Sequence, residues 1–395
     1  MLVTRVLGDC PGCGGKSKFG NVSVRGNFVL RGCMSCKYRT TVSLPALRKK
    51  ILYLDQFFFS SAFHERDPRF VKAAARIREI SAMQLLVAPF SSIHEDETHL
   101  WRGYDGKNKD NLMEFIKTTS RGHKFERRHN VEQTQIVRAF KAFVSEKGES
   151  HNLQDRDAVA GDIHGWDDYF RIDVGRYIGD IELMRDLKRQ SIENLVDVFP
   201  SWRNSTNTFE QDVAAEVRAA AKGYLESYIQ HAARLISGDY NALFDSPEIS
   251  MVVESLLHCL PDNVPLEGQL ERIGAFFKSS HFSEVPFIRL SARIYATLKA
   301  MVKRGAYVDR VDAIRRLSGF FLDVKHVSTY APYCDAFIVD QAMASIVADP
   351  LVGLERAYAV RVYSLNNWDK FLSWLDGLES AMTPEHRAGL VAAYQ

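Results

Sequence analysis

The hydrophobic pattern changes its period along the chain. Residues 51–55 (ILYLD) and 83–90 (MQLLVAPF) are short apolar runs, which are typical of buried parallel strands, and residues 67–82 between them have helical spacing. Residues 91–101 (SSIHEDETHLW) begin a second helix, with one of the two leading serines as N-cap and acidic residues in the first turn. Strand, helix, strand and helix in this order predict an α/β fold with a parallel sheet.

The pattern is different between about residue 105 and residue 305. This part reads as a series of helices, such as residues 131–147 and 207–237, and contains no convincing strand. The sheet is expected to resume with a helix and strand over 314–340 and to end with a strand and a closing helix over 361–375. We therefore expect a sheet interrupted by a large helical insertion. The expected segments are a small N-terminal module (1–45), the first part of the α/β domain (46–105), the helical insertion (106–305) and the second part of the α/β domain (306–395).

Four cysteines in the N-terminal module have the spacing of a zinc ribbon. Cys10 and Cys13 form one CxxC pair and Cys33 and Cys36 form another, and residues 19–32 between them have the alternation of a β-hairpin. Each CxxC makes a tight knuckle, so the hairpin would bring four thiolates around one tetrahedral site. Because all four positions are cysteine, we expect a structural zinc that helps to fold a segment too short for a core of its own.

Composition and charge narrow the function classes. Hydrophobic residues make up 46% of the chain and charged residues 25%, as in ordinary soluble proteins, and the pattern predicts no membrane span, no signal peptide and a cytoplasmic location. Residues 1–50 contain ten Lys or Arg and a single acid, whereas the rest of the chain is mildly acidic. A basic module of this kind favours nucleic-acid binding, and a solvated basic surface is the alternative. The candidate contact residues are Lys16, Lys18, Arg25, Arg31, Lys37 and Arg39.

Two aspartates bracket the apolar run of residues 330–343 (YAPYCDAFIVDQAM). The strand from Asp335 to Asp340 would span about 17 Å, and the preceding helix, from residue 333 back to Asp323, about 15 Å. Asp323 and Asp340 are therefore expected at the same height, at the carboxyl end of the strand. Asp335 lies at the opposite end, where a turn or cap role is expected and a site role is the alternative.

Four acids are expected to converge at the carboxyl ends of the strands. Asp55 follows the first strand, Glu97 (or Glu95) lies in the helix after the next strand, and Asp323 and Asp340 flank a later one. Clustered carboxylates repel one another and persist most readily around divalent cations. Mg²⁺ or Mn²⁺ held in this way activates water and stabilises phosphoryl displacement. The alternative for each acid is a helix cap or a solvated strand end.

The order of these acids resembles the PIN-like nuclease family. Residues 53–60 (YLDQFFFS), 91–98 (SSIHEDET) and 323–340 (DVKHVSTYAPYCDAFIVD) are similar to its acidic motifs. Residues 364–371 (SLNNWDKF) are similar to the segment that often follows and add Asp369 as a candidate. The resemblance covers about 150 residues in two blocks, and the helical insertion departs from a minimal member.

The resemblance implies a PIN-like parallel sheet flanked by helices and a site that binds Mg²⁺ or Mn²⁺ and cleaves single-stranded RNA. It leaves open whether Glu97 or Glu95 is the second acid, of which we prefer Glu97, and it implies a homo-oligomer. A zinc ribbon ahead of such a domain resembles bacterial antiphage ribonucleases. That likeness implies a toxin-like enzyme that stays dormant until a viral protein assembly activates it.

Two other functions compete with this hypothesis. GDIHG at 161–165 matches the opening motif of calcineurin-like metallophosphatases, in which Asp162 and His164 would bind metal. The motif does not follow a convincing strand, and the sequence contains no GNHE and no GDxxDRG, so we expect loop residues instead. The third hypothesis is a non-catalytic adaptor that binds nucleic acid or protein and would tolerate loss of Asp55 and Asp340.

Several further residues near the acids have alternative roles. His94 and His326 would orient phosphate or assist proton transfer, or simply pack in the core. Arg315 and Arg316 would contact RNA phosphates or face solvent. Cys334 lies at the start of a buried strand, where packing is favoured over a role as nucleophile.

Overall fold

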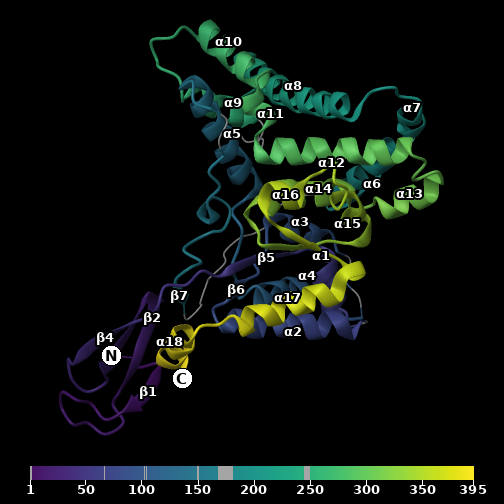
Figure 1. Cartoon of the computed structure of the whole chain (residues 1–395). Coiled ribbons are helices and arrows are strands. Elements are labelled where there is room, and N and C mark those ends of the chain that lie inside the picture. The colour runs from purple at the N-terminus through teal and green to yellow at the C-terminus, as the bar shows by residue number, and fades with distance from the viewer. Residues whose placement is uncertain are drawn as a thin grey trace.

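The computed structural model describes residues 2–65, 67–101, 103, 105–148, 151–167, 181–243 and 250–395. The parts of the expected helical insertion at 149–150, 168–180 and 244–249 lie outside these described residues. Figure 1 shows an elongated molecule with an N-terminal antiparallel sheet at one end, a parallel sheet between helices in the middle, and a group of helices at the other end.

The N-terminal sheet contains the predicted hairpin and one strand from far along the chain. Its strands follow the order β1-β2-β3-β4, and β7 pairs with β2 through Arg25 opposite Asp167 and Gly26 opposite Trp166. The prediction that residues 105–305 contain no strand is therefore wrong, because a two-residue strand is too short to produce a periodic pattern. The strands are β1 (Arg5–Gly8), β2 (Phe19–Gly26), β3 (Phe28–Cys33), β4 (Arg39–Ser43) and β7 (Trp166–Asp167).

The C-terminal helix α18 (Pro384–Tyr394) packs against this sheet. Nδ2 of Asn21 donates to the carbonyl oxygens of Ala392 and Ala393 at 3.2 and 3.0 Å, and Nη2 of Arg31 donates to Ala392 at 3.1 Å. The helix expected to close the fold, α17 (Trp368–Ser380), is thus followed by another. The N-terminal sheet gains two distant segments, β7 and α18, and both ends of the chain lie on it.

The second sheet is parallel throughout, as predicted. Its order is β6-β5-β8-β9, so strands from the two separated α/β segments lie side by side. The strand expected over 83–90 is shorter in the structure, because Pro89 has no N–H for a ladder and Phe90 instead bonds to residues 123 and 125. The strands are β5 (Lys50–Leu54), β6 (Leu86–Val87), β8 (Ala336–Ile338) and β9 (Arg361–Tyr363).

Helices cover both faces of the parallel sheet. Alternate residues of β5 point to opposite sides, so Leu52 and Leu54 pack with α1, α2 and α17, whereas Ile51 and Tyr53 pack with the core beneath α12 and α14. This arrangement confirms the α/β fold with a flanked parallel sheet. The helices around the sheet are α1 (Gln56–Phe63), α2 (Pro68–Ala82), α3 (Ser92–Leu100), α4 (Lys109–Thr119), α12 (Pro286–Lys303), α13 (Arg310–Arg316), α14 (Phe320–Tyr330), α15 (Gln341–Val347) and α16 (Leu354–Tyr358).

The remaining helices form a layer on α12 and an arm beyond it (Figure 1). The long helix α8 is joined to α12 through the buried carboxylate of Asp212, which accepts from Lys299 at 2.6 Å and from Lys303 at 2.8 Å. None of the described helices is long and apolar enough to cross a bilayer. These helices are α5 (Arg128–Val144), α6 (Ile181–Asp197), α7 (Phe199–Arg203), α8 (Phe209–Ile236), α9 (Ser250–Leu257), α10 (Leu266–Phe277) and α11 (Ser280–Ser283), and 3₁₀ turns occur at Asp155–Asp157, Tyr240–Leu243, Ala331–Tyr333 and Leu365–Asn367.

Candidate metal centres and acidic site

The four N-terminal cysteines lie around one point. Sγ of Cys10 is 3.7 Å from Sγ of Cys36, and Sγ of Cys13 is 3.8 Å from Sγ of Cys33. A tetrahedral zinc with bonds of 2.3 Å to sulfur would separate its ligands by about 3.8 Å, so the four thiolates fit this ion. The N–H of Ser35 also donates to Sγ of Cys33, which is the pattern of a knuckle that stabilises a thiolate. The predicted zinc ribbon is consistent with this geometry.

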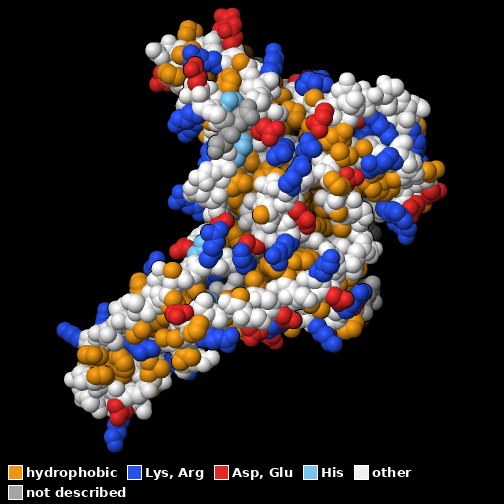
Figure 2. All heavy atoms as spheres, viewed as in Figure 1, with side chains coloured by type: hydrophobic (Ala, Val, Ile, Leu, Met, Phe, Trp, Pro, Cys, Tyr) orange, Lys and Arg blue, Asp and Glu red, His pale blue; other side chains and the backbone are white. Residues whose placement is uncertain are grey.

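The basic side chains expected to contact nucleic acid fall into two groups. Arg31 is half-buried and bonds to Asn21 and to the last turns of α18, so it holds the N-terminal sheet against the C-terminal helix. The others are exposed, and exposed apolar side chains such as Phe28 and Tyr38 lie among them. Figure 2 shows this mixture of basic and hydrophobic side chains at that end of the molecule. The exposed basic residues are Lys16, Lys18, Arg25, Lys37 and Arg39.

Asp55 and Asp340 are brought together by the pairing of β5 and β8. Leu54 and Ile338 are partners at the end of the two parallel strands, and one acid follows shortly after each. Each acid is the N-cap of the next helix, because Oδ1 of Asp55 accepts from the N–H of Gln56 and Oδ1 of Asp340 from that of residue 343, both at 2.7 Å. The caps fix where the carboxylates point.

Glu97 and Asp323 approach the same edge from helices α3 and α14. Oε1 of Glu97 lies 3.5 Å from Nζ of Lys188, and its Oε2 lies 3.6 Å from Nε2 of His326. Ligand atoms of Asp55, Glu97 and His326 all lie within 4.8 Å of one another. Asp323 and Asp340 lie outside this group of three, but their charges raise the pKa of Asp55, so both are close to it. We call these five residues the acidic cluster: Asp55, Glu97, Asp323, Asp340 and His326.

Without a bound cation, the ionised form of the cluster acids is electrostatically unfavourable in the folded protein. Burial raises the pKa of Asp55 well above its usual value, and the neighbouring charges of Asp323, Glu97 and Asp340 raise it further. Burial, followed by the charges of Asp340 and Glu97, does the same to the pKa of Asp323. Burial also raises the pKa of Glu97, and Lys188 opposes this shift. A divalent cation would relieve this repulsion, and carboxylate oxygens are ligands that Mg²⁺ and Mn²⁺ accept.

Three other acids suggested by the sequence lie elsewhere. Glu95 is on the same helix as Glu97, but it pairs with Lys124 at 2.8 Å. Asp335 is at the opposite end of β8, where it accepts from Lys50 at 2.6 Å and from the N–H of residue 51 at 2.9 Å. Asp369 is exposed in the first turn of α17 and belongs to neither group of metal-ligand atoms found among the described residues.

The two histidines near the acids differ in their bonding. His94 is fully buried, with Nε2 bonded to the carbonyl of Leu54 at 2.8 Å and Nδ1 accepting from the N–H of Ser91 at 2.9 Å. It therefore holds α3 against the end of β5. His326 is equally buried, but neither ring nitrogen has a hydrogen-bond partner among the described residues. Burial lowers the pKa of both rings to about 3, so both are neutral.

Other candidate residues have partners within the chain. Arg315 and Arg316 both pair with Asp312, at 2.5 and 2.9 Å, and Cys334 is buried with its thiol donating to the carbonyl of Tyr330.

The GDIHG motif is also structural. His164 bonds to Asp155 at 2.9 Å and accepts from the N–H of Lys49, and Asp162 accepts from the N–H of His164. Within the described part of the chain, neither Asp162 nor His164 belongs to a group of metal-ligand atoms.

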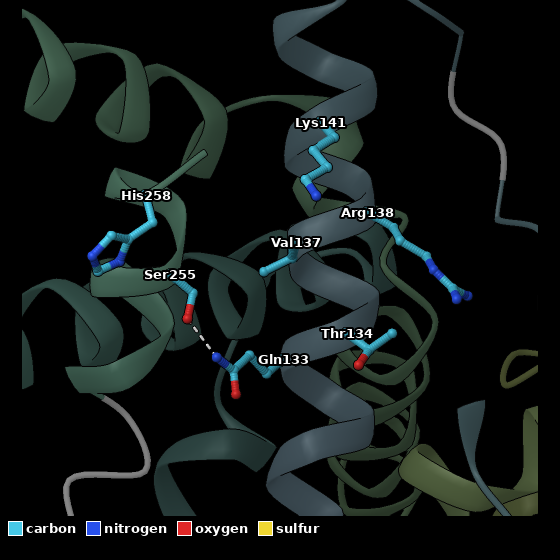
Figure 3. Close-up of a pocket in the computed structure, with 7 residues that line it drawn as sticks. All are labelled: Gln133, Thr134, Val137, Arg138, Lys141, Ser255 and His258. Carbon is cyan, nitrogen blue, oxygen red and sulfur yellow. Dashed lines mark hydrogen bonds between the residues drawn. The ribbon is translucent and has the colours of Figure 1, made fainter. Parts of the chain in front are cut away.

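A pocket of about 480 Å³ lies in the helical arm, between α5 and α9 (Figure 3). Gln133 bonds to Ser255 across it, and Arg138 on its rim pairs with Asp157. Its lining contains no carboxylate, and it belongs to the helical arm rather than to the carboxyl ends of the parallel strands. The pocket therefore lacks the carboxylate ligands that make the acidic cluster a candidate metal site.

Sequence reasoning missed Lys188. It lies on α6, about 90 residues from Glu97 along the chain, and no local motif marks it.

Comparison of the chain with protein-family models, with curated proteins and with solved structures found no match. Function is therefore inferred from the chemistry of the site itself.

Proposed function

We propose that the chain is a metal-dependent endoribonuclease that cleaves single-stranded RNA at the acidic cluster. The observation that carries this proposal is the convergence of Asp55, Glu97, Asp323 and Asp340 at one edge of a parallel sheet, where burial raises all four pKa values and the neighbouring acids of the cluster raise those of Asp55 and Asp323 further. Such an arrangement is costly for folding. It is expected where bound cations and a phosphate substrate make use of the charges.

The chain's own residues have distinct tasks in this proposal. Asp55 and Glu97, whose ligand atoms lie within 4.8 Å of each other, would hold a cation, and Asp323 and Asp340 would face it from the first turn of α14 and from the N-cap of α15. Bound Mg²⁺ or Mn²⁺ supplies an activated water and neutralises charge on the phosphate in the transition state. Lys188, which lies 3.5 Å from Glu97, would contact an RNA phosphate that enters the site.

The N-terminal sheet would guide the RNA. Single strands bind to surfaces that combine positive charge with aromatic faces on which bases stack. Phe28 and Tyr38 are exposed among the basic residues of this sheet and provide both features. The resemblance to PIN-like antiphage ribonucleases extends the proposal to a dormant homo-oligomeric enzyme that a viral protein assembly activates.

The test compares labelled single-stranded RNA after incubation with the wild-type protein and with Asp55→Asn, Asp340→Asn and Glu95→Gln. Each protein is assayed with Mn²⁺, with Mg²⁺ and with EDTA. We expect metal-dependent cleavage that falls by about 100-fold or more in the two Asn variants, in line with the loss of one preorganised transition-state group. Glu95→Gln is the matched control, because Glu95 lies on the same helix as Glu97 and faces away.

Growth arrest on overexpression is scored for the same four proteins, because a dormant enzyme would leave RNA intact in the tube. Arrest that requires Asp55 and Asp340 supports the nuclease. Equal toxicity of all four proteins, or RNA cleavage unaffected by either Asn substitution, overturns the proposal and favours a non-catalytic adaptor.

A further inference from the structure

His326 is a buried histidine beside a carboxylate of the acidic cluster. Its side chain is 1% exposed, and neither Nδ1 nor Nε2 has a hydrogen-bond partner among the described residues. Leaving a buried polar group without a hydrogen bond lowers the stability of the folded state. The neighbouring His94, whose ring centroid is 5.1 Å away, has partners for both nitrogens, so of these two rings only that of His326 lacks hydrogen-bond partners among the described residues.

The unsatisfied nitrogen faces an unsatisfied oxygen. Nε2 of His326 lies 3.6 Å from Oε2 of Glu97, and this carboxylate oxygen is also buried without a hydrogen-bond partner among the described residues. At 3.6 Å the two atoms are too far apart for a hydrogen bond. They are at a suitable separation for two ligands of one ion.

The spacing of the group agrees with octahedral coordination. Ligand atoms of Asp55, Glu97 and His326 lie within 4.8 Å of one another. An ion with bonds of about 2.1 Å separates adjacent ligands by about 3.0 Å and opposite ligands by about 4.2 Å. Movements of a few tenths of an ångström would therefore bring the three side chains onto one cation. The ring of His326 packs against Tyr53 at 5.1 Å between centroids, which fixes its plane.

We propose that His326 is a nitrogen ligand of the divalent cation held by Asp55 and Glu97, and that it makes this site select Mn²⁺ over Mg²⁺. Mg²⁺ keeps an all-oxygen shell, whereas a borderline transition-metal ion accepts imidazole together with carboxylates. The inference rests on the proposed function only in what the bound cation is used for. Selective binding of the cation can be measured without RNA.

The experiment uses the full chain with its zinc bound and measures Mn²⁺ binding by the loss of the free-ion electron paramagnetic resonance signal. Mg²⁺ affinity is obtained by competition in the same samples. Neither ion displaces zinc from four thiolates, because thiolate is a soft ligand that they do not favour. The variants are His326→Gln, which places an amide near the position of Nε2, and His326→Phe, which keeps a ring without a donor.

We expect both variants to bind Mn²⁺ at least tenfold more weakly and to change their Mg²⁺ affinity by less than threefold. His94→Gln is the matched control, because it removes a neighbouring imidazole whose nitrogens already have protein partners. It should lower the free energy of unfolding and leave the Mn²⁺/Mg²⁺ affinity ratio unchanged. An unchanged ratio in both folded His326 variants overturns the inference.

A second measurement needs no substitution and so does not depend on how a variant folds. Wild-type protein labelled with ¹⁵N-histidine is loaded with Mn²⁺, and electron spin echo modulation detects nitrogen bonded to the metal. We expect a ¹⁵N coupling, and its absence overturns the inference even if RNA is cleaved. A coupling in a protein that cleaves no RNA would leave the ligand assignment intact and remove the proposed function.

Discussion

Nζ of Lys188 lies 3.5 Å from Oε1 of Glu97, which links a helix of the insertion to the acidic cluster. The side chain of Glu97 is 13% exposed, and the charge of Lys188 opposes the upward shift that burial gives to its pKa. In the absence of a divalent cation, the positive charge of Lys188 thus offsets part of the negative charge of the cluster. Any cation that binds Glu97 must compete with this ammonium group.

Replacing Lys188 by glutamine should tighten Mn²⁺ binding. Removal of a positive charge beside a cation ligand lowers the repulsion that the ion meets, and we expect the dissociation constant to fall about threefold to tenfold, or up to about 1.4 kcal/mol. The measurement is the Mn²⁺ titration described above. Lys124→Gln is the control, because Lys124 forms a comparable pair with Glu95 on the same helix but away from the cluster. Weaker binding by Lys188→Gln, or an equal gain in Lys124→Gln, would contradict this account.

Asp323→Asn should stabilise the cation-free protein at neutral pH. The folded-state pKa of Asp323 is raised by burial and by Asp340 and Glu97. A raised carboxyl pKa gives a contribution to stability that is present below the unfolded value, near pH 4, and is lost as the pH rises through the folded value. Asparagine does not ionise, so the advantage of the variant should grow from about pH 4 towards pH 8, by about 1.4 kcal/mol for each unit of pKa shift removed.

Chemical denaturation at several pH values checks this prediction. With saturating Mn²⁺ the order should reverse, because the wild-type protein gains binding energy, about 2.7 kcal/mol at 100 times its dissociation constant. Asp369→Asn serves as the control for loss of an exposed acid outside the cluster. A variant that is less stable than the wild type at pH 8 without cations would show that Asp323 is held by favourable contacts instead.

Asp335→Ala should lower the stability of the fold without changing metal binding, because Asp335 and the acidic cluster lie at opposite ends of the same strand. Asp335 accepts from Lys50 and from the backbone of residue 51, whereas Asp340, five residues on, lies in the acidic cluster. Because the Lys50 pair is partly exposed, we expect a loss of about 1–2 kcal/mol of unfolding free energy, mostly from the buried backbone donor. The Mn²⁺ affinity should be unchanged. A fall in Mn²⁺ affinity without a loss of stability would place Asp335 in the site.

The sequence predicts most of the local features of the fold because periodicity and turn chemistry are local. The apolar run that became β5, the serine cap of α3 and the hairpin between the cysteine pairs were all readable in windows of about ten residues. The pairing of β7 with β2 and the docking of α18 were not, because two residues carry no period and packing partners lie more than 100 residues away.

The acidic cluster, too, is only partly predictable from the sequence. Rise per residue along a strand and a helix was enough to place Asp323 and Asp340 at one end and Asp335 at the other, in agreement with their contacts in the structure. The sequence leaves the choice between Glu97 and Glu95 open, whereas in the structure Glu97 lies in the cluster and Glu95 pairs with Lys124. The position of Lys188 beside Glu97 cannot be predicted from the sequence, because it depends on how α6 packs on α3.

Loss of zinc should release the C-terminal helix as well as the ribbon. Asn21 and Arg31 hold the carbonyls at the end of α18 from strands β2 and β3, which the four-cysteine site organises. Cys33→Ser removes one buried ligand, and we expect zinc content to fall from one ion per chain to near zero. Amide hydrogen exchange should then accelerate about tenfold or more in β2, β3 and α18, and stay unchanged in β5.

The matched control for the zinc prediction is Cys259→Ser. Sγ of Cys259 donates to the carbonyl of Ser255 at 3.2 Å, and a serine hydroxyl can make the same bond, so neither zinc content nor exchange in α18 should change. Two outcomes would contradict the prediction. Zinc retained in Cys33→Ser would remove this cysteine from the ligand set. Zinc lost with α18 still protected would show that the helix is held by its packing on Trp166 and Pro45, the closest neighbours of Gly389, and that the ribbon folds apart from it.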